Sequence, residues 1–307
     1  MNINANNMVL VLFFATFLLL NVAISTLYLE THTDEILYID PAINLAEGNG
    51  FVSSAWMSQS KDEFWASNVP LYPIIQAGVM KIFGTELAVS RIFAYILAVF
   101  SGIFLSIGLR NYDLIKLAKL RNACVIFFLM IFPIAYTYQS GRPDIISLIL
   151  ASTTFAITSM SHSNLRNILL ILSSTLIPLA SLALVFLIVT ALLLCFLFFG
   201  RRIIEDAKLI ISGIILGAML MIAFYFFNNS LNQFLMITFG SGHTLLGQIA
   251  QYFIFEDDRI LTKIKEFPMT YFRSLFSWHY SMILMTISYL LLLSRKINRN
   301  QLNYFFI

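Results

Sequence analysis

Carboxylates gather in one polar stretch of an otherwise apolar chain. Residues 31–50, THTDEILYIDPAINLAEGNG, contain Asp34, Glu35, Asp40 and Glu47 and directly follow an apolar run. Carboxylates can accept a proton from a reacting hydroxyl, and they can bind hydroxyl groups or cations. We therefore expect this stretch to carry the chemistry and the remaining chain to act as a hydrophobic frame that presents it.

The spacing of residues in this stretch predicts a helix. Its apolar residues recur at helical intervals, at Ile36, Ile39, Ile43 and Ala46. Thr33 is suited to cap this helix, Pro41 to bend it and Gly48 to end it. Asp34 and Tyr38 are four residues apart, so a carboxylate and a phenol share one face. The alternative is that the early acids only stabilise the helix N-terminus through its dipole, worth about 0.3 to 1 kcal/mol.

Three basic residues and one more acid complete the candidate site. Arg142 and Asp144 belong to a GRPD motif, where the guanidinium could grip a phosphate and the carboxylate could hold a sugar hydroxyl or orient a neighbour. Lys81 and Arg91, on the same side as Asp34, are candidate phosphate ligands. The alternatives are an Arg142–Asp144 ion pair or headgroup anchor, and long basic side chains that snorkel to an interface.

The composition is that of an integral membrane protein of the all-α class. Of 307 residues, 59% are hydrophobic and 11% are charged, and the mean hydropathy is +0.83. Soluble domains are nearer half apolar and a quarter charged. Cys124 and Cys195 both fall inside apolar runs, which predicts buried thiols and no disulfide framework. No phosphate-binding glycine motif is present, so neither a soluble nucleotide-sugar domain nor a nucleic-acid partner is expected.

A single polytopic membrane domain, 1–307, is predicted, with about eight transmembrane helices. A hydrocarbon core needs about 20 apolar helical residues, although shorter spans occur. The spans are expected at 8–27, 92–109, 124–138, 145–160, 209–227 and 279–293, with two more in a hairpin between 166 and 201 that turns near 176–181. Two long loops, 28–91 and 228–278, are expected to contain short interfacial helices, one of them at 69–84.

The distribution of basic residues predicts the orientation. Eleven of the 19 fall in short segments on one side, at Arg110, Lys116, Lys119, Arg121, Arg166, Arg201, Arg202, Lys208, Arg295, Lys296 and Arg299. Short loops rich in Lys and Arg stay in the cytoplasm. Both termini are therefore expected in the cytoplasm, and both long loops outside the cytoplasmic (inner) membrane.

No metal site is predicted from ligand spacing. The four histidines, His32, His162, His243 and His279, lack zinc spacing. The acidic run 256–258 lacks an EF-hand pattern, so a solvated turn is the favoured interpretation. No cofactor is assigned, and a requirement for a divalent cation stays open.

The order of motifs in the first half of the chain is similar to that of a known enzyme family. The sequence DE is followed by Tyr38 and an A-x-x-L-x-x-G-x-G run at 42–50, then by P-x-Y-P leading to K-x-F-G within 70–84, then by Arg91, and later by R-x-D at 142–144. This order resembles the GT-C glycosyltransferases, particularly the dolichyl-phosphate mannosyltransferase-like and aminoarabinose-transferase-like membrane enzymes, families 39 and 83.

The resemblance implies transfer of a sugar from a polyprenyl-phosphate donor to a lipid, glycan or protein acceptor outside the cytoplasm. It implies that Asp34, with Glu35 adjacent, is the catalytic base or its partner. Members of that family often continue into more helices or an outer soluble domain. Both a truncated chain and a compact member therefore remain open.

Two other classes of function fit a polar patch on a membrane domain. One is a flippase or transporter of lipid-linked sugars, although such folds often show internal repeats and mid-membrane charges, neither of which is evident here. The other is a non-catalytic membrane subunit of a glycan assembly complex.

Overall fold

The described part of the chain folds into helices, which are joined by turns and by a longer loop at 48–70. The computed structural model describes residues 5–27, 33–56, 59–112, 115, 117–139, 141–199 and 204–240. Within these residues the structure contains no strand, and an isolated bridge between Val52 and Phe64 is its one β-type pairing. The predicted all-α class is confirmed for this part of the chain.

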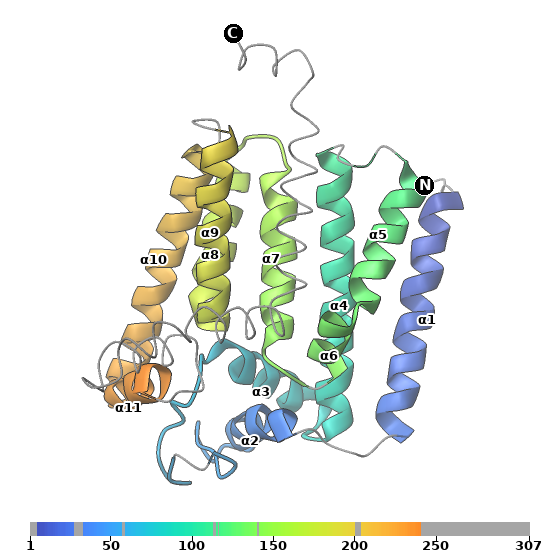
Figure 1. Cartoon of the computed structure of the whole chain (residues 1–307). Helices are drawn as coiled ribbons and strands as arrows, with labels where there is room; N and C mark the ends of the chain where they lie inside the picture. The colour runs from blue at the N-terminus through green and yellow to red at the C-terminus, as the bar shows by residue number, and fades with distance from the viewer. Residues whose placement is uncertain are drawn as a thin grey trace, which may run out of the picture.

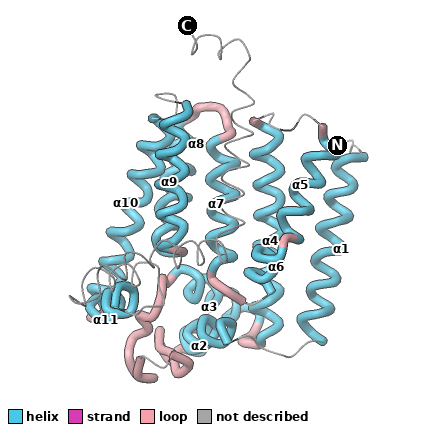
Figure 2. The backbone as a smooth tube through the Cα atoms, viewed as in Figure 1, coloured by secondary structure: helices cyan, strands magenta, loops and turns pink. Residues whose placement is uncertain are grey.

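The long helices lie side by side in space (Figure 1). In chain order, the helices of the described part are α1 (Ala5–Leu27), α2 (Thr33–Glu47), α3 (Leu71–Phe83), α4 (Leu87–Asn111), α5 (Ala118–Met130), α6 (Phe132–Gln139), α7 (Asp144–Thr158), α8 (Asn164–Ala180), α9 (Leu182–Phe199), α10 (Ile204–Phe227), α11 (Leu231–Leu235) and a π-helical turn η2 (Met236–Gly240). The short helices α2, α3 and α11 gather at one end of the long ones, together with the loop that joins α2 to α3 (Figure 2).

The breaks between helices follow from proline and turn residues. The predicted hairpin is confirmed, because α8 ends at Ala180 and α9 begins at Leu182, with Ser181 extended between them. The predicted helix at 124–138 is not continuous: Ile131 separates α5 from α6. Pro133 has no N–H to donate and would clash with the carbonyl four residues earlier, which explains the break.

Two described helices, α4 and α10, are long and apolar enough to cross a membrane by length and composition. Shorter apolar stretches occur in α1, α3, α7, α8 and α9. The predicted eighth span at 279–293 and most of the loop at 228–278 lie outside the described residues.

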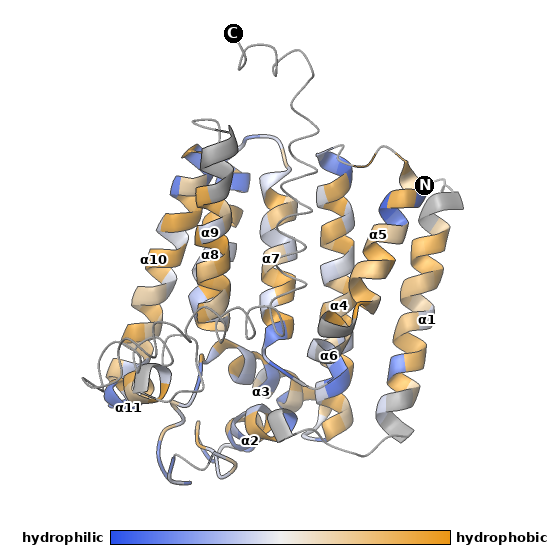
Figure 3. Ribbon diagram, viewed as in Figure 1, coloured by the Kyte–Doolittle hydropathy of each residue, from blue (hydrophilic) through white to orange (hydrophobic). Residues whose placement is uncertain are grey.

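Apolar residues predominate along the long helices (Figure 3), and many of their large side chains are exposed. Leu19 on α1 is 72% exposed and Phe127 on α5 is 67% exposed, and further large apolar side chains are exposed along α8, α9 and α10. In water, monomeric proteins rarely expose contiguous apolar patches larger than a few hundred Å². The helical part thus has apolar side chains in its core and also on its exposed surface.

Charged residues lie at the ends of the long helices. The end of α4 and the beginnings of α5, α8 and α10 all lie at the end of the bundle opposite α2 and α3 (Figure 1). These segments contain the described members of the predicted inner basic set, Arg110, Lys119, Arg121, Arg166 and Lys208. There Arg166 is buried and donates to both carboxylate oxygens of Asp206, at 2.8 and 2.6 Å, which ties α8 to α10.

Glycines allow the backbones of α8 and α10 to approach closely. A methyl group added at Gly213 would lie 2.6 Å from the carbonyl oxygen of Ile171, and one added at Gly217 would overlap the carbonyl oxygen of Thr175. Small residues at such contacts let helices pack backbone to backbone.

We expect Gly217→Ala to destabilise the protein by about 1 to 3 kcal/mol, because the obstructing atom is backbone and cannot rotate away. Gly78→Ala on α3 is the matched control, since nothing lies within 4 Å of its added methyl group. That change should be neutral or stabilising by up to about 1 kcal/mol, because alanine has the higher helix propensity. Thermal unfolding in detergent compares the two, and equal midpoints would contradict the close α8–α10 contact.

Candidate functional site

The helix α2 carries the predicted acids and is held to α3 by its apolar face. Ile39 and Ala42 are buried against Ala77 and Met80 of α3. The helix begins at Thr33 and ends at Glu47, with Gly48 at a φ of 86°. The predicted boundaries of this helix are confirmed. Asp34 lies in its first turn, and the side chain of Asp34 is outside the described part of the structure.

Glu35 and Arg91 form a buried ion pair. Arg91 Nε donates to Glu35 Oε1 and Arg91 Nη2 donates to Glu35 Oε2, both at 2.8 Å. The Glu35 side chain is 0% exposed and that of Arg91 is 5% exposed. A two-pronged guanidinium–carboxylate pair is the strong form of this interaction. The pair joins the first turn of α2 to the first turns of α4. Each of the two charges is neutralised by the other.

The GRPD motif packs onto this ion pair. Gly141 has a φ of 61°, and a methyl group added there would lie 2.7 Å from Glu35 Cγ. A side chain at this position would therefore push the loop away from α2. The contact brings two candidates into one region, because Asp34 precedes Glu35 and Arg142 follows Gly141.

Arg142 and Asp144 are paired with each other at the start of α7. Arg142 Nε donates to Asp144 Oδ2 at 2.7 Å. Their side chains are 18% and 40% exposed, so this pair, unlike the buried one, is open to solvent. Ion pairs in contact with solvent typically contribute less than about 1 kcal/mol, and Arg142 and Asp144 are both partly accessible to a ligand.

Tyr38 and Lys81 occupy different surroundings. Tyr38 is half-buried, and its phenol oxygen accepts a hydrogen bond from Asn68 Nδ2 at 2.7 Å. Lys81 is exposed in the last turn of α3. Of the two cations predicted to neutralise a phosphate near this end, Lys81 is thus on the surface and Arg91 is in the interior.

A buried polar cluster lies where α3 meets α4. Gln76 Nε2 donates to Ser90 Oγ and, at 3.3 Å, to Tyr72 Oη. Burial, together with the nearby charge of Glu35, raises the pKa of Tyr72, so its phenol stays protonated. The cluster fixes α3 against α4 beneath the site.

Sequence reasoning missed the structural role of Asp40. Its Oδ2 accepts hydrogen bonds from Ser53 Oγ and Ser54 N at 2.7 Å and from Ala55 N at 3.3 Å. This carboxylate holds the loop after α2 rather than a substrate. The serine pair 53–54, placed after the glycines that end the helix, was a signal for such a turn.

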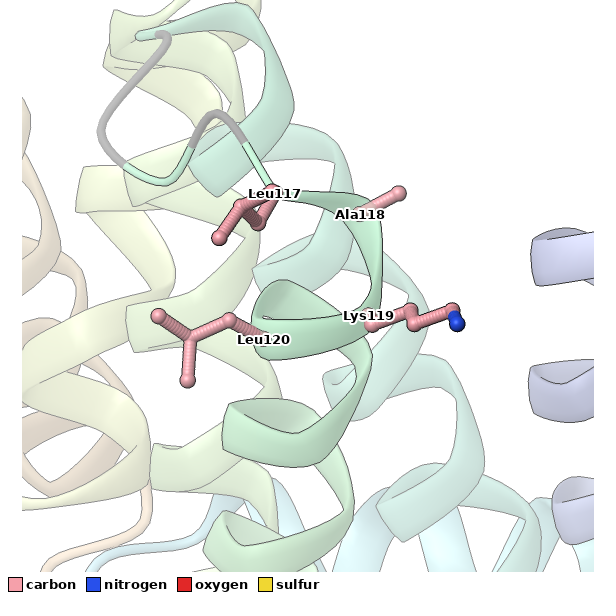
Figure 4. Close-up of a pocket in the computed structure, with 4 residues that line it drawn as sticks. All are labelled: Leu117, Ala118, Lys119 and Leu120. Atoms are coloured by element: carbon pink, nitrogen blue, oxygen red, sulfur yellow. The ribbon is translucent and has the colours of Figure 1, made fainter.

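A hollow in the surface lies elsewhere. It is lined by Leu117, Ala118, Lys119 and Leu120 at the beginning of α5, and Lys119 points away from the two leucines (Figure 4). This end of α5 is opposite to α2 and α3 (Figure 1), so the hollow is separate from the candidate site.

Metal ligands do not converge in the described part of the chain. Within those ranges, no group of three or more His, Cys, Asp or Glu side chains is close enough to bind a metal ion. The acidic run at 256–258 and the histidines His32, His243 and His279 lie outside the described residues.

In comparisons with known proteins, no family model, curated protein or solved structure matches this chain.

Proposed function

We propose that this protein is a membrane glycosyltransferase that moves a sugar from a polyprenyl-phosphate donor to a lipid, glycan or protein acceptor outside the cytoplasmic membrane. The observation that carries the proposal is the contact of Gly141 with Glu35, 2.7 Å for an added methyl group. It brings the first turn of α2, which carries Asp34 and Glu35, close to the turn that precedes Arg142 and Asp144, at one end of an apolar helical frame. An acid beside a cation, next to apolar helices, suits a substrate with a charged head and a lipid tail.

Exposed apolar side chains support placing the frame in a membrane. Two described helices have membrane length, and large apolar residues are exposed on most of the others. We propose about eight spans in total, with the basic end in the cytoplasm and α2 and α3 outside it, following the positive-inside rule.

The proposed reaction needs one base and one phosphate-binding group. Asp34 accepts the proton of the acceptor hydroxyl while that oxygen forms a bond to the anomeric carbon. The bond from that carbon to the phosphate oxygen breaks, and its electron pair leaves with the polyprenyl phosphate. A phosphate leaves without being protonated, so no second carboxyl is required as an acid, in contrast to glycoside hydrolysis.

The structure supports a division of roles among the other candidates. Arg142, which is partly exposed, and Lys81, which is exposed, are assigned to the donor phosphate, and Asp144 to a sugar hydroxyl. The charges of Glu35 and Arg91 neutralise each other in the interior, so these two are assigned to positioning Asp34.

The direct test incubates the purified protein with a panel of polyprenyl-phosphate sugars and a mixture of lipid acceptors. We expect polyprenyl phosphate to appear with at least one donor, as measured by mass spectrometry. Movement of donor across vesicles with no loss of its sugar linkage would favour a flippase instead. Release that occurs only when a second protein co-purifies would favour a non-catalytic subunit.

A further inference from the structure

Pro41 leaves one carbonyl group of α2 without its helical hydrogen-bond donor, and Trp56 supplies a donor in its place. A proline inside a helix cannot donate to the carbonyl four residues earlier, so the carbonyl of Leu37 loses its helical partner. The indole Nε1 of Trp56 donates to that carbonyl at 2.7 Å. The loop thereby places a large aromatic ring against α2, about one helical turn after Asp34.

The chain that leads to Trp56 is fixed at a second point. Asp40 accepts hydrogen bonds from Ser53, Ser54 and Ala55, the three residues that precede the tryptophan. Two anchors on one helix, three residues apart, leave this segment little freedom. The position of the ring is therefore set before any ligand binds, which lowers the entropic cost of binding.

The ring of Trp56 is supported by other aromatic rings and is still accessible. It meets Tyr38 edge to face, with centroids 5.8 Å apart and planes at 77°, and Trp65 at 6.1 Å and 61°. Trp65 is fully buried, whereas Trp56 and Tyr38 are only partly buried. Edge-to-face contacts of this kind are favourable and hold a ring in one orientation.

Tyr38 is itself held in place by a hydrogen bond to its phenol oxygen. Asn68 donates from Nδ2 to the Tyr38 phenol oxygen at 2.7 Å, and the Asn68 carbonyl accepts the hydroxyl of Tyr225 on α10. Because Tyr38 is four residues after Asp34, helical spacing puts these two positions on one face of α2. The supported rings therefore flank the face that carries the proposed base.

We propose that Trp56, supported by Tyr38, is a stacking platform for the pyranose ring of a substrate sugar. The C–H faces of a pyranose are apolar and pack on aromatic rings, while its hydroxyl groups remain at the edge. A sugar on this platform would direct an edge hydroxyl toward the first turn of α2. The inference rests on the proposed glycosyl transfer and names a specificity-determining residue for it.

Three variants test the platform in the transfer assay, with the donor and acceptor concentrations varied separately. Trp56→Leu removes the aromatic face, whereas Trp56→Phe keeps a ring and loses the hydrogen bond to Leu37. Phe64→Leu is the control, because Phe64 is a half-buried ring of the same loop that packs on Phe51 and Phe224. All three are first compared for thermal unfolding in detergent.

We expect Trp56→Leu to raise KM by about tenfold for one sugar substrate, as follows from the loss of one aromatic contact of about 1.4 kcal/mol. Trp56→Phe should lie closer to the parent, and Phe64→Leu should leave KM unchanged. A rise confined to the donor KM assigns the platform to the donor sugar, and a rise confined to the acceptor KM assigns it to the acceptor.

Other results overturn the platform. If Trp56→Leu and Trp56→Phe lower the unfolding temperature equally and leave both KM values unchanged, the indole only fastens the loop to α2. If the parent protein transfers no sugar, the proposed function fails. In that case quenching of tryptophan fluorescence by a polyprenyl-phosphate sugar, lost in Trp56→Leu and kept in Phe64→Leu, still reports binding, and its absence removes the platform as well.

Discussion

Replacing Glu35 with glutamine is expected to lower the free energy of unfolding by about 3 to 5 kcal/mol. The substitution keeps the size of the side chain and removes only its charge. Arg91 then remains buried beside a neutral amide, with its side chain 5% exposed. An arginine cannot release its proton to escape this situation, so the cost falls on the folded state. Unfolding in mixed detergent micelles, followed by circular dichroism, measures the difference.

Glu205→Gln is the matched control for this substitution. Glu205 pairs with Lys208 at 3.0 Å, and both side chains are exposed to solvent. The same chemical change should therefore cost less than about 0.5 kcal/mol. The double variant Glu35→Gln, Arg91→Met should regain part of the loss, because no unpaired charge remains inside. If Glu35→Gln is as stable as Glu205→Gln, Glu35 and Arg91 do not form a buried ion pair.

Helix positions could be predicted from local rules. Pro178 and Ser181 mark the end of α8 in the sequence, and Gly48 marks the end of α2. The spacing of apolar residues and the position of proline and glycine are local properties, so they can be seen directly in the sequence. The break at Ile131 was missed because the apolar run continues through it, although Pro133 gave the signal.

The partners of the site residues could not be predicted from the sequence. Glu35 and Arg91 are 56 positions apart, and either could equally have faced solvent or a phosphate. Their pairing depends on how α2 and α4 each pack against α3, which is decided by the packing of the whole helical frame. The same holds for Gly141, whose contact with Glu35 requires the turn before α7 to fold back over α2.

For the hydrogen bond that anchors Trp56, the acceptor could be predicted from the sequence, but the donor could not. A proline inside α2 implies that the Leu37 carbonyl needs a new donor, since buried carbonyls rarely go unpaired. Which donor reaches it depends on the path of the loop, and in the structure this path is set by Asp40 and two serines. Asp40 therefore resembles a candidate catalytic acid in the sequence and is a loop anchor in the structure.

Replacing Asp34 with asparagine is expected to reduce sugar transfer by about 100-fold to 10,000-fold, the usual contribution of a general base. Asparagine has the same shape but cannot accept the proton of the acceptor hydroxyl. Binding of the donor should persist, because the phosphate is assigned to Arg142 and Lys81 rather than to this carboxylate. The loss should therefore appear in kcat, with the donor KM changed much less.

Asp62→Asn is the control for this substitution, since Asp62 is an exposed acid of the loop between α2 and α3. It should transfer sugar at the parental rate. Unfolding of Asp34→Asn should match the parent, which separates it from Glu35→Gln, where any loss of transfer follows from loss of structure. Because the two acids are adjacent, the catalytic base is distinguished from its positioning residue only by comparing the stability and the transfer rate of the two variants. If Asp34→Asn is stable and transfers sugar at the parental rate, the base lies elsewhere, and Asp144, 40% exposed beside Arg142, becomes the next residue to substitute.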